Sequence, residues 1–210
     1  QGLAEARSLG LREVEGRLLN ALAVAIEKQG DLVGAQDLHR QNLLIKRETD
    51  DHVGEAGALL NVGRLSLGDL TQARRELDAA LQLTRANGDR ATESVALINL
   101  SALALWQGDE TRALALARQA LDMAVAAQAR DREVDAALRL GDAEQVLGRM
   151  AAARQAFTRA RLRALEIDFV GQHDASAGLA RVALAEGDTA AARTALQPLL
   201  EHVAAGGTLD

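Results

Sequence analysis

The side chains that could do chemistry in this 210-residue chain are few and widely spaced. The chain has no cysteine, which excludes disulfides, thiol catalysis and thiolate metal sites. Its four histidines, His39, His52, His173 and His202, lack histidine or carboxylate partners at the spacing that a metal site needs. No serine or threonine has a histidine and an aspartate in a plausible arrangement, and no glycine-rich loop could hold a phosphate. We therefore predict a protein with no enzyme activity, no cofactor and no metal.

The nearest approach to a ligand cluster is the segment Asp50-Asp51-His52. It could hold a metal ion, or it could be a turn in which aspartate caps the following helix by accepting from its free backbone amides. We favour the capping interpretation, because aspartate is among the preferred residues at this position.

Six polar residues stand within segments that we expect to be the inner helices of a helical array. Such a residue either bonds to backbone carbonyls of neighbouring residues or lines a groove and binds a partner. Both interpretations are open from the sequence. The candidates for partner binding are Asn20, Asn61, Asn99, Arg139, Asp142 and Arg181.

Positive charge gathers between residues 149 and 165, where five arginines occur without an acidic residue. On a helix they occupy more than one side. The segment is either a solvated outer face that pairs with acids of adjacent helices or a docking surface for an acidic partner domain. Nucleic acid is not an expected partner, because the formal net charge of the chain is −6. The five residues are Arg149, Arg154, Arg159, Arg161 and Arg163.

An internal repeat defines the elements that must position these residues. Five turn glycines are separated by 38, 40, 40 and 39 residues, and four of them are followed by aspartate. Glycine can end one helix in a left-handed conformation, and aspartate can cap the next. A leucine stands eight residues before each glycine and an alanine five residues after it. The glycines are Gly30, Gly68, Gly108, Gly148 and Gly187, the leucines Leu22, Leu60, Leu100, Leu140 and Leu179, and the alanines Ala35, Ala73, Ala113, Ala153 and Ala192.

A second small-residue position lies twelve residues after the glycine. Alanine occupies it in the middle three repeats, whereas Asn42 and Leu199 break the pattern in the first and last. The leucine is expected to be a knob on the first helix of each pair, and the alanines leave room for close packing. Trp106, at the end of the apolar stretch 95–106, is expected to fill the core rather than form a binding platform.

The pattern predicts five helix pairs, which must stack because no pair can bury its apolar side alone. First helices are expected at 11–29, 51–67, 89–107, 130–147 and 171–186, and second helices at 31–48, 69–87, 109–128, 149–167 and 188–204. The single array would comprise the end of a preceding helix (1–10) and repeats at 11–50, 51–88, 89–129, 130–169 and 170–210, with Gly206-Gly207 ending the last helix. The low proline content, with Pro198 alone, agrees with an all-α chain.

The combination of leucine, Gly-Asp turn and spaced alanines resembles the tetratricopeptide repeat (TPR), in a form closer to 40 than to the usual ~34 residues. The segment Gly88 to Glu93 is similar to the opening of repeats in large bacterial signalling proteins, including maltose-activator-like regulators, signal-transduction NTPases and cyclases. The resemblance implies a right-handed superhelical α-α solenoid whose first helices line a concave groove. It also implies a groove that can bind an extended peptide. The charged clamp that some family members use for a terminal carboxylate is not evident, because the aligned positions hold Val24, Val62 and Ala102.

We predict a non-catalytic interaction and sensor region that binds a peptide or protein partner and regulates an attached signalling or transcriptional effector domain. The alternatives are a self-association module, such as a homodimer, and small-ligand sensing in the groove. No window is apolar enough to span a bilayer, so no membrane role is expected. The opening Gln1-Gly2-Leu3 is neither a start methionine nor the basic opening of a signal peptide, so we expect an excised piece of a longer protein, with the cytoplasm as its default location.

Overall fold

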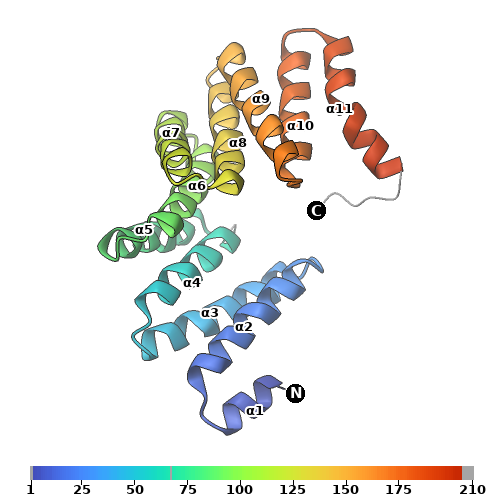
Figure 1. Ribbon diagram of the computed structural model, residues 1–210. Coiled ribbons are helices and arrows are strands. Elements are labelled where there is room, and N and C mark those ends of the chain that lie inside the picture. The colour runs from blue at the N-terminus through green and yellow to red at the C-terminus, as the bar shows by residue number, and fades with distance from the viewer. Residues whose placement is uncertain (1, 67, 205–210) are drawn as a thin grey trace. The chain divides into compact units, whose positions relative to one another are not determined.

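The computed structural model describes residues 2–66 and 68–204, apart from the side chain of His202. Within these residues the secondary structure is helical, with no strand, as the composition predicts (Figure 1). Every predicted helix begins and ends within two residues of an observed one, and the predicted all-α solenoid fold of helix pairs is confirmed. The helices are α1 (Gly2–Ser8), α2 (Arg12–Glu27), α3 (Leu32–Glu48), α4 (His52–Leu65), α5 (Leu70–Ala86), α6 (Arg90–Trp106), α7 (Glu110–Ala126), α8 (Arg130–Val146), α9 (Met150–Glu166), α10 (Gly171–Ala185) and α11 (Thr189–Ala204).

Aspartates start most of the helices that follow a turn. The carboxylate of Asp31 accepts from the backbone N–H of Gly34 at 2.8 Å, and Asp51 accepts from that of Gly54 at the same distance. The neighbouring Asp50 has a left-handed φ of 51°, which makes the Asp50-Asp51-His52 segment a turn and a cap, as favoured from the sequence. Four of the turn glycines are left-handed, with φ between 73° and 87°; Gly68 directly follows residue 67, which lies outside the described residues.

The chain divides into two compact units, which we describe separately. Unit 1 spans residues 1–99, and within it α2 packs on α3, α3 on α4, and α4 on α5. Its core is made of leucines such as Leu19 and Leu77 interleaved with fully buried alanines such as Ala35. The alanine positions predicted to allow close helix packing are therefore confirmed in this unit.

Unit 2 spans residues 100–210, and in it α7 packs on α8, α8 on α9, α9 on α10, and α10 on both α8 and α11. Its largest fully buried side chain is Phe157. The ring fits only because two helical glycines face it: a Cβ on Gly141 would lie 2.5 Å from the ring, and one on Gly178 would lie 2.6 Å away. Glycine here is a requirement of packing.

Two sequence-based expectations about burial are wrong. Trp106 is 59% exposed, because Leu103 and Ala104 take the inward positions of the last turn of α6. Leu22 is 43% exposed, because Leu19 and the neighbouring Ala23 form the buried stripe of α2. The single five-repeat array and its boundaries stay a prediction, and Gly206-Gly207 lies outside the described residues.

Candidate binding surfaces

The structure does not bring the six candidate groove residues into one site. Asn20 and Asn61 meet in unit 1, and the Nδ2 of Asn61 donates to the Oδ1 of Asn20 at 3.2 Å. Arg139, Asp142 and Arg181 meet in unit 2. Asn99 is half-buried on α6 and belongs to neither group.

The asparagine pair of unit 1 lines a cavity of about 280 Å³ between α2, α3 and α4, which we call the amide pocket. A third asparagine, Asn42 of α3, also lines it and is 4% exposed. The sequence had marked Asn42 only as a break in the alanine pattern. Arg17 and Lys46 add positive charge to the same walls.

The charged group of unit 2 lies on the first helices α8 and α10. Asp142 accepts hydrogen bonds from Arg139 at 3.0 Å and from Arg181 at 2.8 Å. The guanidinium of Arg181 also lies 5.6 Å from the centre of the Phe157 ring, a cation–π contact. Burial raises the pKa of Asp142 despite the two arginines. All three candidates are thus engaged with one another within the unit.

The residue of this face that the sequence did not single out is Asp135, which lies near Arg139 on α8. Its carboxylate is half-buried and has no hydrogen bond or ion pair with the described residues. Burial raises its pKa to about 6, and the nearby carboxylates of Asp131 and Asp174 act in the same direction, while Arg139 opposes them. A partly buried carboxylate without a partner is unfavourable unless something pairs with it.

The five arginines of the basic segment lie on or next to α9, and four of them pair with acids. Arg149 pairs with Glu144, Arg154 with Glu186, and Arg159 with Glu133. Arg163 pairs with both Glu133 and Glu166. Only Arg161, of the five, makes no ion pair within the described part of the chain.

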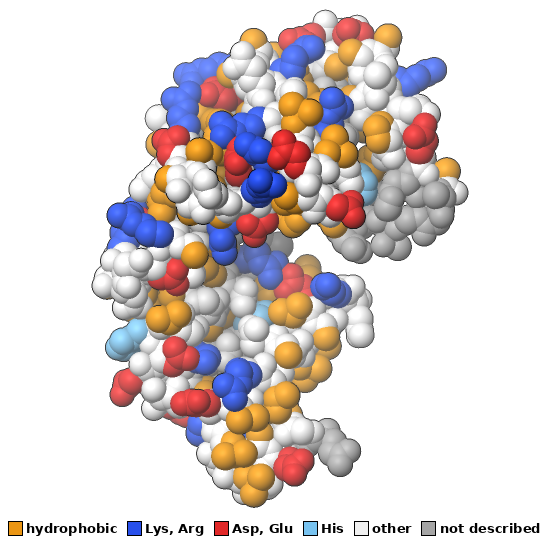
Figure 2. All heavy atoms as spheres, in the orientation of Figure 1, with side chains coloured by type: hydrophobic (Ala, Val, Ile, Leu, Met, Phe, Trp, Pro, Cys, Tyr) orange, Lys and Arg blue, Asp and Glu red, His pale blue; other side chains and the backbone are white. Residues whose placement is uncertain are grey.

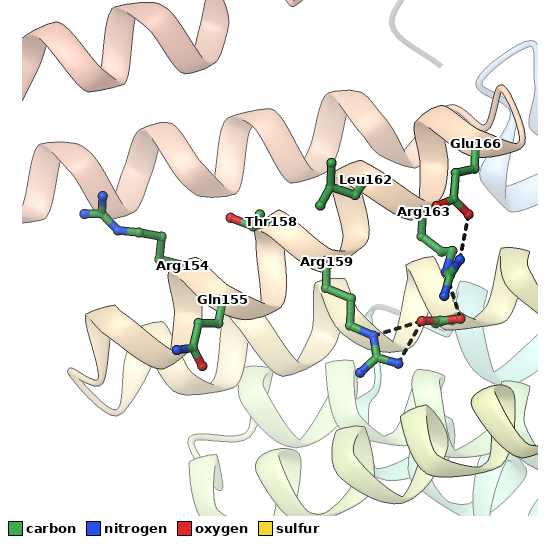
Figure 3. Close-up of a pocket in the computed structure, with 8 residues that line it drawn as sticks. Arg154, Gln155, Thr158, Arg159, Leu162, Arg163 and Glu166 are labelled. Carbon is green, nitrogen blue, oxygen red and sulfur yellow. Dashed lines mark hydrogen bonds and ion pairs between the residues drawn. The ribbon is translucent and has the colours of Figure 1, made fainter.

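A cavity of about 530 Å³ opens over this face (Figure 3). Figure 3 shows Arg159 and Arg163 of α9 directed at one carboxylate, while Leu162 points away from them. The ion pairs of the two arginines identify that carboxylate as Glu133 of α8. Burial alone would raise the pKa of Glu133, but hydrogen bonds from the two arginines outweigh it and lower that pKa. The positive charge of the segment is therefore largely neutralised in place.

Glu133 belongs to a series of acids that the sequence analysis missed. Glutamates recur in the first turn of four first helices at spacings of 40, 38 and 40 residues, a signal that a search for repeated acids would have found. In the first three repeats the partner is an arginine eight residues earlier, as in Arg85–Glu93 at 2.9 Å. In the fourth, Val125 occupies that place, and α9 supplies the arginines instead. The glutamates are Glu15, Glu55, Glu93 and Glu133.

The described residues contain neither a candidate metal site nor a candidate membrane-spanning helix. No group of three His, Asp or Glu side chains there could hold a metal ion. None of the described helices is long and apolar enough to cross a membrane. His39 is fully buried, and burial lowers its pKa, so it is a neutral core residue.

The sequence matches no protein-family model and no curated protein. Among solved structures it is similar to BtubC (BKLC) from P. vanneervenii, with a TM-score of 0.77 and 20% identity over 97% of this chain and 87% of that chain. It is also similar to a kinesin light chain of Podosopora anserina with nearly identical TPR-like repeats, with a TM-score of 0.66 and 16% identity over 86% of this chain and 91% of that chain. A variant of that protein has a TM-score of 0.67 and 15% identity over 96% of this chain and 95% of that chain. The likeness establishes a TPR-like repeat fold.

Proposed function

We propose that this chain is a non-catalytic protein-interaction module whose first-helix face in unit 2 binds a basic side chain of a peptide or protein partner. The observation that carries the proposal is the half-buried, unpaired carboxylate of Asp135. TPR-like repeats generally bind protein partners, and this fold supports the same role here. In a longer parent protein, capture of the partner would bias an attached signalling or transcriptional domain.

The charge around Asp135 favours a cationic partner. Asp131 and Asp174 raise its pKa further, whereas Arg139 and Arg132 lower it, and Arg139 is already hydrogen-bonded to Asp142 at 3.0 Å. A lysine or arginine of a partner would supply the missing charge and would lower the pKa of Asp135 on binding. Binding should therefore weaken as the pH falls through about 6.

The test is binding of a panel of 15-residue peptides that carry lysine or arginine, each paired with a peptide in which glutamine replaces the basic residue. We expect selective binding of basic peptides and a loss of about tenfold in affinity on Asp135→Asn, measured by fluorescence anisotropy. Asp122→Asn is the matched control, because Asp122 is exposed on α7, the second helix of its pair. Its substitution changes the net charge by the same amount as Asp135→Asn. Equal losses in the two variants, or no preference for basic peptides, would count against the proposal.

Self-association is a second candidate function, favoured by apolar exposure in unit 1. Leu9, Leu11 and Leu22 are 63%, 47% and 43% exposed, and Figure 2 shows hydrophobic side chains gathered over α1 and the start of α2. If this surface pairs with a second copy, light scattering will show a shift from the monomer mass to twice that mass as the protein concentration rises. The double variant Leu9→Ser, Leu11→Ser will then stay at the monomer mass. A monomer at all concentrations would exclude it.

A further inference from the structure

Helix α3 of unit 1 carries polar side chains at two positions where the other second helices have apolar ones. Nine residues after the turn glycine, α3 has His39, whereas α5 has Leu77 and α9 has Phe157. Twelve residues after that glycine, α3 has Asn42 in place of the alanine of the middle three repeats. Both polar side chains of α3 are buried, His39 completely. The repeat pattern therefore places an imidazole and an amide where the other repeats place apolar core residues.

The buried polar atoms of these two side chains lack hydrogen-bond partners. Neither ring nitrogen of His39 has one among the described residues, and the Oδ1 of Asn42 also has none there. Buried polar atoms are almost always hydrogen-bonded, and one that is not destabilises the fold because its bond to water has been lost. The helices that pack against α3 are α2 and α4. Their packing against α3 is therefore weakened by polar groups that α5 and α9 do not have at these positions.

The charged groups around His39 do not compensate for a charge on the imidazole ring. Arg64 of α4 donates two hydrogen bonds to the carboxylate of Glu27 of α2, at 2.6 and 2.8 Å. Burial lowers the pKa of His39, while Glu27 acts to raise that pKa and Arg64 acts to lower it. The hydrogen bonds from Arg64 lower the pKa of Glu27, so Glu27 stays ionised over the pH range in which histidine titrates. The buried ring is accordingly neutral.

The packed and released forms of α3 bind different numbers of protons. While α3 is packed, the ring of His39 stays neutral because burial disfavours its charged form. When α3 separates from α2 and α4, the ring is hydrated, and its pKa returns to the ordinary value of 6.5. The released form then takes up a proton below that pH. Acid therefore favours release, and the stability that α3 has at neutral pH is lost as the pH falls below about 6.5.

We propose that α3 is an acid-sensitive switch: protonation of His39 releases α3 from α2 and α4 and opens unit 1, while unit 2 stays folded. The unpartnered amide of Asn42 keeps this packing weak, so that a single buried charge shifts the equilibrium. Unit 2 responds to acid in the opposite direction through Asp135, whose pKa of about 6 lies above the ordinary value, so that protonation favours its folded form. The switch does not depend on the basic partner proposed for unit 2.

The experiment is hydrogen exchange of the full chain without any partner, at pH 7 and pH 5, with rates corrected for the intrinsic effect of pH. Uptake of one proton on release predicts that the protection of α3 falls about 10- to 25-fold between these pH values. The protection of α8 and α9 should not fall. His39→Leu, which introduces the residue of the next repeat, should fold normally and abolish the fall. His52→Gln is the matched control, because His52 is exposed at the start of α4, and it should leave the fall unchanged.

A second variant separates titration from general weakness of the helix. Asn42→Ala should raise the protection of α3 by the same factor at both pH values and keep the fall between them. In the parent protein, NMR signals of the His39 ring should show the neutral form wherever α3 is protected. A pH-independent protection of α3, a fall that survives His39→Leu, an equal fall in α8 and α9, or a protonated ring within protected α3 would overturn the proposal. The peptide-binding test of Asp135 is separate, so either proposal can fail alone.

Discussion

The two units are built from similar helix pairs, but the space beside a helical glycine is filled by a side chain in unit 2 and left open in unit 1. In unit 2, Phe157 fills the space over Gly141 and Gly178. In unit 1, the space beside Gly57 is left open and lined by amides and cations. Two side chains without an ion pair among the described residues also differ in sign: the carboxylate of Asp135 on the first-helix face of unit 2, and the guanidinium of Arg17 at the pocket of unit 1.

This difference teaches that a repeat can keep its fold while a few substitutions change what it offers to a partner. The alanines that allow close helix packing are buried in both units, and this packing maintains the repeat fold. Unsatisfied groups or empty space occur instead at positions such as Asn42, Gly57 and Asp135, of which Asn42 also breaks the alanine pattern. The following predictions test whether packing and binding are separated in this way.

The largest effect is expected from Phe157→Ala, which would remove the ring that fills unit 2. Truncating a buried phenylalanine typically lowers the free energy of unfolding by about 3–5 kcal/mol, because apolar contacts are lost and a cavity remains. The ring also supports Arg181, which is bonded to Asp142 at 2.8 Å. Urea denaturation of the full chain measures the change. Hydrogen exchange should show lost protection in α8 to α10 but not in α2 to α4, and equal loss in both would contradict a role of the ring confined to the packing of unit 2.

A smaller loss is expected from Gly141→Ala. The new Cβ would lie 2.5 Å from the Phe157 ring, so the ring must move, and such overpacking costs about 1–3 kcal/mol of unfolding free energy. Phe157→Leu removes the ring atoms that the new Cβ would meet and should relieve part of the clash, although the Gly63–Leu77 pair of unit 1, where a Cβ would lie 2.8 Å from Leu77, shows that a leucine can also require glycine opposite it. The double variant Gly141→Ala with Phe157→Leu, compared with each single variant in a double-mutant cycle, measures the coupling. Additive effects would show that the glycine does not serve the ring.

The sequence was sufficient for the fold because its information lay in local, repeated signals. Gly108 followed by Asp109 fixes where one helix ends and the next begins, and such turns allowed every helix to be located. Pairings between repeats could not be read in this way. Glu133 takes its arginines from 26 and 30 residues later, because Val125 replaces the arginine used in earlier repeats. A pattern of residue types gives no distances across helices.

Binding residues were harder to predict than the fold for the same reason. Polarity alone selected Asn99 and Arg139, but burial and missing partners, which only coordinates give, single out Asp135. Trp106 shows the converse error, since an apolar residue in an apolar helix was assigned to the core and is 59% exposed. Asn42 was visible in the sequence as an exception, and exceptions to a repeat were the better guide to the candidate sites.

Asp135→Asn should raise stability in a pH-dependent way. The folded-state pKa is about 6, above the ordinary value of 3.8, so the unfavourable charge of Asp135 is absent at low pH and develops as the pH rises from about 4 to 6. The difference in unfolding free energy between variant and parent should be near zero at pH 4 and about 1–2 kcal/mol at pH 7 in favour of the variant. Carboxylates whose pKa is lowered in the folded state, such as Glu27 and Asp51, stabilise the fold above their ordinary pKa and lose that stabilisation as the pH falls below it. Because they are present in both the variant and the parent, their effect cancels in the difference in unfolding free energy. A pH-independent difference would show that Asp135 titrates normally.

The smallest effect is expected from Gly57→Ala, and it opposes that of Gly141→Ala in sign. Both glycines lie in the interior of first helices, so the gain in helical propensity, about 0.5–1 kcal/mol, is available at each. At Gly141 the clash with Phe157 cancels that gain, whereas at Gly57 nothing lies within 4 Å of the new methyl group. Thermal unfolding of the two variants in parallel gives the comparison directly. If Gly57→Ala is also destabilising, the pocket wall is packed more tightly than its open space implies, and the glycine there would be a requirement of the fold.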